Sequence, residues 1–323
     1  MKAIRVDKFG EPEVLVYEEV VRPEPAPDEI LIEIEAAGVN FVDVYHRTGQ
    51  YQTGLPMTPG VEGAGRVAAV GMDVRRFERG DRVAYAMEMG SYAEYAVVPA
   101  ERAVKVPEEI DVREAAAVML QGMTAHYLTH STYPLEENEV VLIHAAAGGV
   151  GSLLVQIADL HGAHVIGTAS TEEKAERAGE LGADEMILYT ELDFEREVER
   201  ITLGEGVDVV YDGVGEATFL KGLNCLKRRG TMVLFGQASG AVEPIDPQVL
   251  KQKGSLYLTR PSLGDYVATR EELERRANHL FEWMEGGLLS VRVDRMFPLE
   301  DAAEAHRYIQ NRKTRGKLLL MPQ

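Results

Sequence analysis

A short run of small residues between a predicted buried strand and a helix has the clearest chemical meaning in this chain. Residues 140–151 read VVLIHAAAGGVG, and the last six fit G-x-G-x-x-G with alanine at the first position. Small residues there allow a tight turn, a close backbone approach to a pyrophosphate, and packing of the helix on its strand. The start of that helix offers free N–H groups and about half a positive charge. We therefore predict a dinucleotide site that uses Gly148, Gly149 and Val150, rather than a merely structural turn.

The residues after the next predicted strand bear on which dinucleotide fits. NAD-binding proteins usually place Asp or Glu about 20 residues after the glycines, but residues 167–174, GTASTEEK, have no acid at the strand end. Ser170 and Lys174 are suited to hold a 2′-phosphate, and one charge-assisted hydrogen bond contributes about 1.5–3 kcal/mol. The alternative is that residues 170–173 are a helix capping box and Lys174 an exposed helix lysine. We expect NADPH.

Other reactive side chains give weaker patterns. His126 and His130 have the four-residue spacing of metal ligands on a helix, but no glutamate of the H-E-x-x-H type and no evident third ligand accompany them. Cys225 lies between leucines on a predicted helix, which favours a small core residue over a nucleophile. We expect no metal site and no nucleophilic catalysis.

Composition narrows the function classes further. The chain has 323 residues, a formal net charge of −19 and one cysteine. One cysteine excludes intramolecular disulfides and iron–sulfur clusters, and it fits a reducing, cytoplasmic location. The negative charge disfavours nucleic acid, because duplex affinity depends on clustered Lys and Arg. No apolar run approaches the ~20 residues of a membrane helix, so no membrane span is expected.

The elements that position these residues suggest two domains. Short strands with Gly and Pro turns fill the first third, which is typical of a sandwich or a partly open barrel. Helices are expected over Arg113–Leu120 and Met123–His130, and strands and helices then alternate up to about residue 254. Such alternation predicts an α/β fold with a doubly wound parallel sheet. We expect one domain from residues 1–122 plus 260–323, and an inserted nucleotide-binding domain from residues 123–259.

Seven segments together resemble a known family over essentially the whole chain. They are GVNFVDVY (38–45), PGVEGAG (59–65), GDRV (80–83), GSYAEY (90–95), HAAAGGVG (144–151), YDGVG (211–215) and LTRPSL (258–263). The chain resembles the zinc-independent medium-chain dehydrogenases/reductases, in their quinone oxidoreductase (zeta-crystallin-like) branch. Zinc-dependent members carry a cysteine where this chain has Asn40 and a histidine where it has Val61. The resemblance therefore implies chemistry without a metal.

The resemblance also implies a fold and a set of site residues. The fold is a GroES-like β-barrel domain with an inserted Rossmann domain and an active cleft between them. Catalytic roles fall to Asn40 and Tyr45, and substrate contacts to Tyr45, Tyr51 and Arg260. The cofactor-binding residues are Asn40, Thr124, Gly148, Gly149, Val150, Ser170, Thr171, Lys174, Tyr189, Gly236, Gln237, Ala238, Ser239 and Arg312. Structural alternatives remain open: Asn40 could satisfy a turn, Tyr45 could be a core tyrosine, and Arg312 a cation at a helix end.

The implied activity is NADPH-dependent reduction of a quinone by direct hydride transfer. Reduction of an α,β-unsaturated carbonyl, an enone or enoyl thioester, would use the same apparatus, and the sequence does not separate the two. An alternative of another class is a crystallin-like or RNA-binding protein that only binds NADPH. The resemblance further implies a homodimer that pairs sheet edges formed by residues 255–260.

Overall fold

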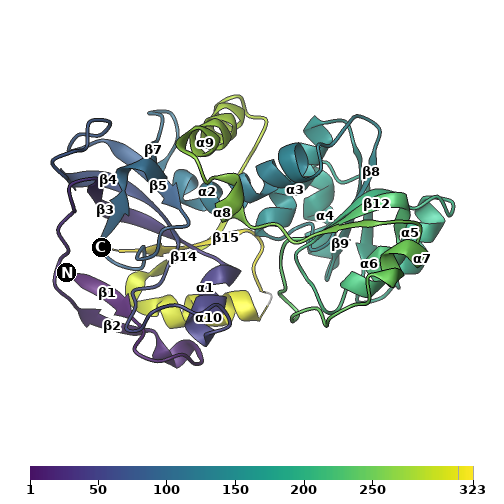
Figure 1. Ribbon diagram of the computed structural model, residues 1–323, viewed down its shortest axis with the longest axis horizontal. Coiled ribbons are helices and arrows are strands. Elements are labelled where there is room, and N and C mark those ends of the chain that lie inside the picture. The colour runs from purple at the N-terminus through teal and green to yellow at the C-terminus, as the bar shows by residue number, and fades with distance from the viewer. Residues whose placement is uncertain (312, 323) are drawn as a thin grey trace. The chain divides into compact units, whose positions relative to one another are not determined.

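The computed structural model describes residues 1–311 and 313–322, and the chain divides into two compact units (Figure 1). Unit 1 comprises Met1–Met123 and Val267–Gln323, and unit 2 is Thr124–Tyr266. We expected the chain to return to the first domain at residue 260, seven residues earlier than Val267. Two contacts explain the later position. Tyr266 stacks on Tyr127 of its own unit, with ring centroids 4.3 Å apart, and the Val267 carbonyl accepts from Arg102 Nη1 at 2.7 Å within unit 1.

Unit 1 is built mainly on antiparallel strands, with one parallel pair, β14 and β15. Its strands are β1 (Lys2–Arg5), β2 (Val16–Glu19), β3 (Glu29–Val39), β4 (Glu62–Val70), β5 (Arg82–Ala86), β6 (Tyr95–Pro99), β7 (Ala103–Lys105), β14 (Val293–Pro298) and β15 (Lys317–Met321). Its helices are η1 (Pro12–Val14), α1 (Phe41–Thr48), η2 (Ala100–Arg102), most of α2 (Val112–Tyr127), α9 (Arg270–Glu285), η4 (Leu299–Asp301) and α10 (Ala302–Gln310). The large sheet has the order β14-β15-β3-β4-β5-β7, and β6 also pairs with β3. Strands from both ends of the chain therefore share one sheet.

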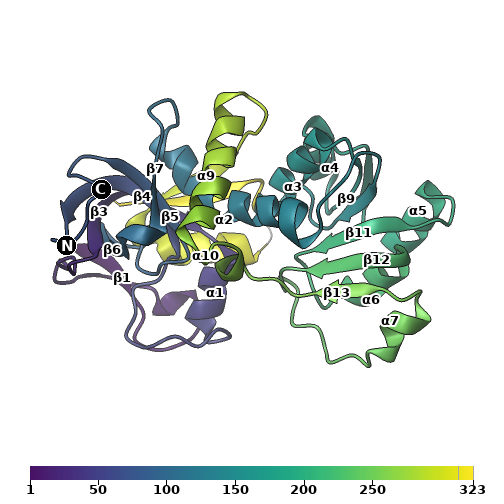
Figure 2. The ribbon, with the colours of Figure 1, turned by 45° about the horizontal axis from the view of Figure 1, so that its top comes forward.

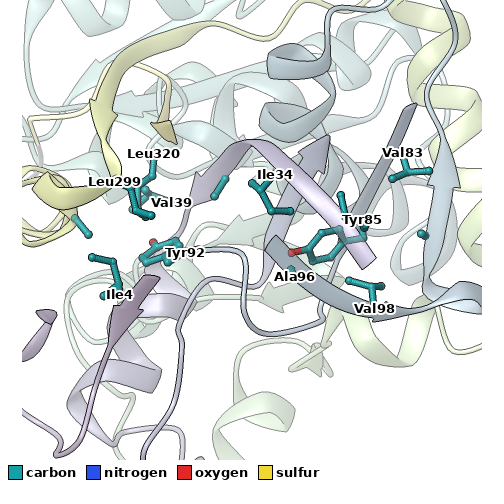
Figure 3. Close-up of a cluster of buried hydrophobic side chains, with 14 of the residues drawn as sticks. Ile4, Ile34, Val39, Val83, Tyr85, Tyr92, Ala96, Val98, Leu299 and Leu320 are labelled. Atoms are coloured by element: carbon teal, nitrogen blue, oxygen red, sulfur yellow. The ribbon is translucent and has the colours of Figure 1, made fainter. Parts of the chain in front are cut away.

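A cluster of buried apolar side chains holds unit 1 together (Figure 3). It includes Ile4 of β1, Ile34 and Val39 of β3, Val83 of β5 and Leu320 of β15. Alternate residues of a strand point to the same face, so Ile30, Ile32 and Ile34 of β3 enter the cluster together, and an irregularity between Ile34 and Ala36 then brings Ala37 and Val39 to it. The C-terminal strand β15 is thereby fixed against β3, with Leu319 opposite Gly38.

The helix α2 differs from the sequence prediction. We expected two helices, Arg113–Leu120 and Met123–His130, but α2 is continuous from Val112 to Tyr127 and continues into a π-helical turn, η3 (Leu128–Thr132). Gly122 does not break it, because glycine here serves packing: a Cβ would lie 2.8 Å from Val118 Cγ2 and 2.9 Å from Leu280 Cδ1. No helix among the described residues is long and apolar enough to cross a membrane.

Unit 2 is a parallel sheet with helices on both faces. Its elements are η3, β8 (Val140–Ile143), α3 (Gly149–Leu160), β9 (His164–Ala169), α4 (Glu172–Glu180), β10 (Glu185–Leu188), α5 (Phe194–Ile201), β11 (Val207–Asp212), α6 (Phe219–Asn224), β12 (Leu226–Leu234), α7 (Gln248–Gln252), β13 (Tyr257–Thr259) and α8 (Leu263–Tyr266). The strand order is β10-β9-β8-β11-β12-β13. Helices α3 and α4 lie on one side of the sheet, and α6 and α7 on the other (Figure 2).

This order is the doubly wound 3-2-1-4-5-6 arrangement. The chain moves outward from β8 to β9 and β10, returns to β11 on the other side of β8, and then continues to β12 and β13. Ligands of such sheets bind outside the carboxyl ends of the strands at the point where the order reverses. In unit 2 that point lies between β8 and β11.

Candidate active site

The glycine-rich segment of unit 2 follows β8 directly at the reversal point. The loop 144–148 leads into α3, whose first residue is Gly149. A Cβ on Gly151 would overlap the Ala145 carbonyl oxygen and lie 3.0 Å from Ala146 Cα. Only glycine therefore lets α3 start so close to the loop. The first N–H groups of α3 have no carbonyl within the helix to bond, so they are suited to phosphate oxygens.

Thr168 holds this loop from the neighbouring strand β9. Its hydroxyl oxygen accepts from the Ala145 N–H at 3.2 Å and lies 3.1 Å from His144 Nδ1, and its carbonyl accepts from the Ala146 N–H at 3.0 Å. Burial lowers the pKa of His144, so its imidazole is neutral at pH 7. Neither Thr168 nor His144 was predicted as a site residue. His144 lies in the glycine-rich segment quoted above, and Thr168 places a hydroxyl on the strand beside it; these were the sequence signals.

The loops after β11 and β12 meet at the same end of the sheet. Asp212 Oδ1 accepts from the N–H groups of Val214 and Gly215, at 2.7 and 3.0 Å. The hydroxyl of Ser239 donates to the Val214 carbonyl at 2.8 Å. The predicted cofactor residues Gly236, Gln237, Ala238 and Ser239 therefore lie beside the Asp212 loop, and the Ser239 hydroxyl is used to hold the two loops together.

The predicted 2′-phosphate residues gather where β9 and β10 end. Ser170 follows β9, and Tyr189 follows β10 and donates its N–H to the Ala169 carbonyl at 3.1 Å. Thr171 is the N-cap of α4, and its hydroxyl accepts from the Lys174 N–H at 3.3 Å. The helix is therefore capped by Thr171, one residue later than the capping box considered for residues 170–173, and Lys174 lies in the first turn of the helix.

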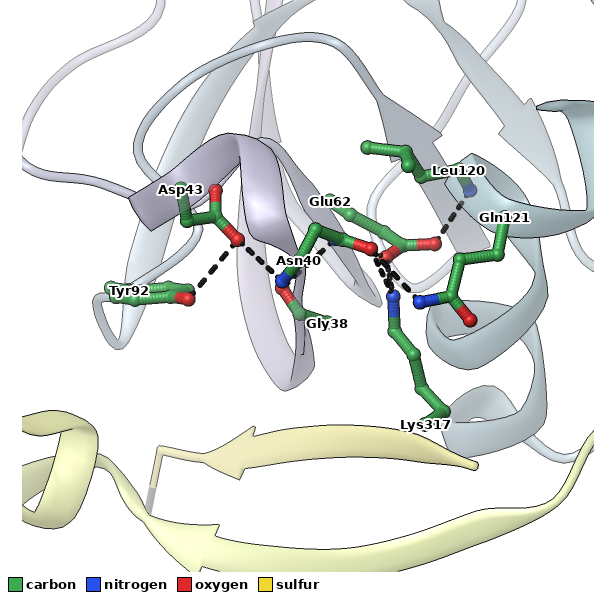
Figure 4. A network of polar contacts seen from close by, with 8 residues as sticks. All are labelled: Gly38, Asn40, Asp43, Glu62, Tyr92, Leu120, Gln121 and Lys317. Atoms are coloured by element: carbon green, nitrogen blue, oxygen red, sulfur yellow. Dashed lines mark hydrogen bonds and ion pairs between the residues drawn. The ribbon is translucent and has the colours of Figure 1, made fainter. Parts of the chain in front are cut away.

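In unit 1, Asn40 lies at the centre of a buried polar network (Figure 4). Its Oδ1 accepts from Lys317 Nζ at 2.7 Å and from Gln121 Nε2 at 3.2 Å. Its Nδ2 donates to Glu62 Oε2 at 2.8 Å and, more weakly, to the Gly38 carbonyl at 3.5 Å. All four hydrogen-bonding positions of the amide are used inside unit 1.

An ion pair between Lys317 and Glu62 supports the Asn40 amide. Both side chains are fully buried, and Lys317 Nζ donates to Glu62 Oε2. The other carboxylate oxygen, Oε1, accepts from the Leu120 N–H at 2.6 Å. A Cβ on Gly38 would overlap Glu62 Oε2 and lie 2.8 Å from Lys317 Cε. The glycine at position 38 therefore leaves room for this ion pair.

A second buried chain of polar groups begins at Asp43. Asp43 Oδ2 accepts from the Asn40 N–H at 2.8 Å and from the Tyr92 hydroxyl at 3.2 Å. The Tyr92 hydroxyl lies 3.1 Å from His306 Nε2, and His306 Nδ1 lies 3.3 Å from Arg47 Nη1. Because Arg47 can only donate, His306 Nδ1 accepts, Nε2–H donates to Tyr92, and Tyr92 donates to Asp43.

Burial shifts the pKa values of Asp43 and His306, two titratable members of this row of polar groups, in opposite directions. Burial raises the pKa of Asp43 to about 7, although the Asn40 N–H, the Lys317 ammonium and the Tyr92 hydroxyl oppose that rise. Burial and the Arg47 charge lower the pKa of His306 to about 3. Near neutral pH His306 is therefore uncharged, and Asp43 is poised between its two forms.

Aromatic side chains gather on and after α1. Tyr45 lies on α1 and is 9% exposed, and its ring centroid is 5.1 Å from that of Tyr51 and 6.3 Å from that of Phe41. Tyr51 is 36% exposed, and its N–H donates to the Tyr45 carbonyl at 3.0 Å. The structure thus brings together Tyr45 and Tyr51, the two tyrosines predicted to bind substrate.

The other predicted residues are Thr124, Arg260 and Arg312. Thr124 is buried on α2, and Arg260 is exposed directly after β13. Arg312 lies outside the described residues. The assignments of catalytic, substrate and cofactor roles remain predictions.

The network residues Glu62, Lys317, Gln121, Asp43, Tyr92 and His306 were not predicted as site residues. Glu62, Asp43 and Tyr92 each lie in one of the family segments, which was the available signal. Lys317 opens a strand of apolar residues, KLLLM. Nothing in that local pattern indicates a buried lysine with a carboxylate partner.

The histidines with metal-ligand spacing stack on each other. The rings of His126 and His130 are 4.1 Å apart and nearly parallel, and His130 Nε2 lies 3.3 Å from His161 Nε2. Across residues 1–311 and 313–322, no group of three or more His, Cys, Asp or Glu side chains is arranged to hold a metal ion. Cys225 is buried, and burial raises its pKa to about 12, which keeps the thiol protonated.

Known proteins resemble this chain along its full length. Two family descriptions match: "Alcohol dehydrogenase GroES-like domain" over residues 26–108 and "Zinc-binding dehydrogenase" over residues 149–278. The chain is 45% identical to the quinone oxidoreductase of Pseudomonas aeruginosa, with 99% of each chain covered. It is 42% identical to a 2-haloacrylate reductase of a Burkholderia species, with 98% of each covered.

A solved structure gives the same result for the fold. The Escherichia coli quinone oxidoreductase complexed with NADPH matches with a TM-score of 0.98 and 44% identity, covering all of both chains. The fold is therefore a GroES-like domain with a Rossmann domain, as predicted. The chain belongs to the medium-chain dehydrogenase/reductase family, in its quinone oxidoreductase (zeta-crystallin-like) branch.

Proposed function

We propose that this protein is an NADPH-dependent quinone oxidoreductase that transfers a hydride directly to its acceptor without a metal. One combined observation carries the proposal: a glycine-rich loop at the reversal point of a doubly wound sheet, in a chain that matches quinone oxidoreductases at 44–45% identity over its whole length. Relatives this similar are enzymes, so an NADPH-binding protein without turnover is not the proposed function.

The residues of unit 2 fit the cofactor. Gly151 in the first turn of α3 has no room for a Cβ beside the Ala145 carbonyl, so the helix packs closely on the loop, as the third glycine of a dinucleotide-binding motif allows. We propose that Ser170, Lys174 and Tyr189 bind the 2′-phosphate, since they gather at the ends of β9 and β10 and Lys174 brings a positive charge. NADPH supplies the hydride when bound.

The residues of unit 1 are proposed to serve the acceptor. The Tyr45 and Tyr51 rings offer a surface for a flat, electron-poor molecule. The oxygen that gains charge during reduction needs a hydrogen-bond donor, and we propose the Tyr45 hydroxyl for it. The amide of Asn40 is less suited to this donation, because both of its N–H groups are already directed at Glu62 and Gly38.

A conjugated carbonyl is a second candidate acceptor. The specific observation in its favour is the 42% identical 2-haloacrylate reductase, whose named substrate has a carbon–carbon double bond next to a carboxylate. Hydride addition to such a double bond would place the same demands on the cofactor site and on a donor near the acceptor oxygen.

We also propose a homodimer and a cytoplasmic location. The strand β13 ends the sheet of unit 2, and Tyr257 and Leu258 are exposed on it, so this edge is able to pair with a second copy. Light scattering should then give twice the chain mass of 35.6 kDa. The single, buried cysteine supports a reducing compartment.

The activity test measures the loss of reduced nicotinamide with a panel of quinones and enones, with NADPH or NADH, and with or without a chelator. We expect turnover with quinones, a preference for NADPH, and no effect of the chelator. NADPH carrying deuterium at the transferred position should slow the reaction if hydride transfer limits the rate. NADPH binding without turnover of any acceptor, or a strict metal requirement, would exclude the proposed function.

A further inference from the structure

The ion pair between Lys317 and Glu62 is an unusual way to stabilise the inside of a domain. Both side chains are fully buried. Moving two charges out of water costs about as much free energy as their attraction returns, so well-packed apolar side chains of similar volume would stabilise the domain as well or better. A merely structural lysine at the start of β15 would therefore gain little over a methionine. What the ion pair does provide is a fixed orientation for its neighbours, because a charged donor and a charged acceptor are directed at one amide.

That amide belongs to Asn40. Its oxygen faces the Lys317 ammonium at 2.7 Å, and its nitrogen faces the Glu62 carboxylate at 2.8 Å (Figure 4). An amide turned by 180° would place its N–H groups against the ammonium and its oxygen against the carboxylate, so the two charges exclude that rotamer. Gln121 adds a second donor to the amide oxygen at 3.2 Å.

The same ion pair also joins α1 and α2, and each of these helices carries a predicted site residue. Asn40 directly precedes α1, on which Tyr45 lies. Glu62 Oε1 holds the Leu120 N–H of α2 at 2.6 Å, and Thr124 follows four residues later on that helix. A shift of this pair would therefore move the start of α1 and the middle of α2 together.

We propose that Lys317 and Glu62 are positioning residues of the reaction, holding Asn40, and through it α1 and α2, in the geometry that hydride transfer needs. The proposal rests on the proposed function. It assigns them no contact with substrate or cofactor. Misplacement of reacting groups by about 1 Å is able to cost a hundredfold in rate, so the predicted effect falls on kcat and much less on NADPH affinity.

The test compares single and double neutral variants. Lys317→Met leaves Glu62 as a buried, uncompensated charge, and Glu62→Gln does the same to Lys317, so each single variant should lower both Tm and kcat. The double variant removes both charges and should recover most of the Tm. It still lacks the donor to Asn40 Oδ1, so its kcat should remain lower by about tenfold or more. Its Kd for NADPH should stay within about threefold of wild type.

A second variant keeps the test decisive if the double variant folds poorly. Gln121→Met removes the other donor to Asn40 and leaves no buried charge unpaired, so kcat should fall by about threefold to tenfold with little change in Tm. Lys105→Met is the matched control: Lys105 is a strand lysine of unit 1 whose partner is Asp81 at 2.7 Å, and it is more than half exposed. It should leave Tm and kcat near wild type.

The outcomes separate the two proposals. A double variant with recovered Tm and wild-type kcat would show that the ion pair is only structural and would overturn the inference. A Gln121→Met variant with unchanged kcat would show that the donors to Asn40 Oδ1 do not set the rate, which would also overturn it. Wild-type protein that binds NADPH but reduces no acceptor would instead overturn the proposed function, before any variant is compared.

Discussion

Replacing Asp43 with asparagine should change how the stability of unit 1 depends on pH. The folded carboxyl group has its pKa raised from 3.8 to about 7, mainly by burial. Between these two values the folded protein holds a proton that the unfolded chain has released. The stabilisation from this group is therefore complete below pH 3.8 and is lost as pH rises toward 7. One such proton changes the free energy of unfolding by about 1.4 kcal/mol per pH unit, and the full cost at alkaline pH is about 4 kcal/mol.

Asparagine preserves the contacts and removes the titration. Its Oδ1 is able to accept from the Asn40 N–H and the Tyr92 hydroxyl, as Asp43 Oδ2 does at 2.8 and 3.2 Å. Asp43 Oδ1 has no hydrogen-bond partner, so the new NH₂ group would be unpaired there. That cost does not depend on pH, so the comparison uses slopes rather than absolute stabilities.

Denaturant unfolding followed by tryptophan fluorescence provides the measurement. The single tryptophan, Trp283, lies in unit 1 and reports its unfolding. The free energy of unfolding of wild type minus that of Asp43→Asn should fall by about 3 kcal/mol between about pH 4.5 and 6.5, and be flat above about pH 8. A difference that stays constant from about pH 4.5 to 8 would refute the argument, because it would mean that Asp43 titrates alike in both states.

Three further predictions follow from the same structure. His306→Gln should show the opposite slope, because the pKa of His306 falls from 6.5 to about 3 on folding. The stabilisation from His306 is therefore complete above pH 6.5 and is lost as pH falls toward 3. In the same unfolding assay, the free energy of unfolding of wild type minus that of the variant should rise with pH between about 4 and 6. Lys174→Ala should weaken NADPH binding about tenfold to a hundredfold and leave NADH binding nearly unchanged in fluorescence titrations, and equal losses for both cofactors would contradict a 2′-phosphate role. Gly151→Ala should abolish most NADPH affinity in the same titrations, because the new Cβ overlaps the Ala145 carbonyl oxygen. Gly179→Ala is the control: its Cβ would have nothing within 4 Å, so this variant should bind NADPH as wild type does.

The sequence predicted the Rossmann part well because its determinants are local. The small residues of 146–151, the apolar strand before them and the alternation of strands with helices each act within a few neighbouring residues. The structure has the predicted loop directly before α3, which begins at Gly149. The continuous helix α2 was missed, because Gly122 reads as a helix breaker until its packing against Leu280 is known.

The polar network of unit 1 has no local signature. Asn40, Glu62, Gln121 and Lys317 come from segments up to 277 residues apart in sequence. Each residue type alone is ordinary at a strand end or on a helix. Only when β15 pairs with β3 does the lysine reach the carboxylate and the amide.

The sequence by itself therefore determined the class of cofactor, the two-domain fold and the position of the glycine-rich loop, because glycine spacing and hydrophobic periodicity are properties of contiguous residues. The tertiary structure alone decided the state of the buried groups. Whether Asn40 is free to donate, whether Asp43 carries a proton and which partner neutralises Lys317 depend on burial and on contacts between residues far apart along the chain.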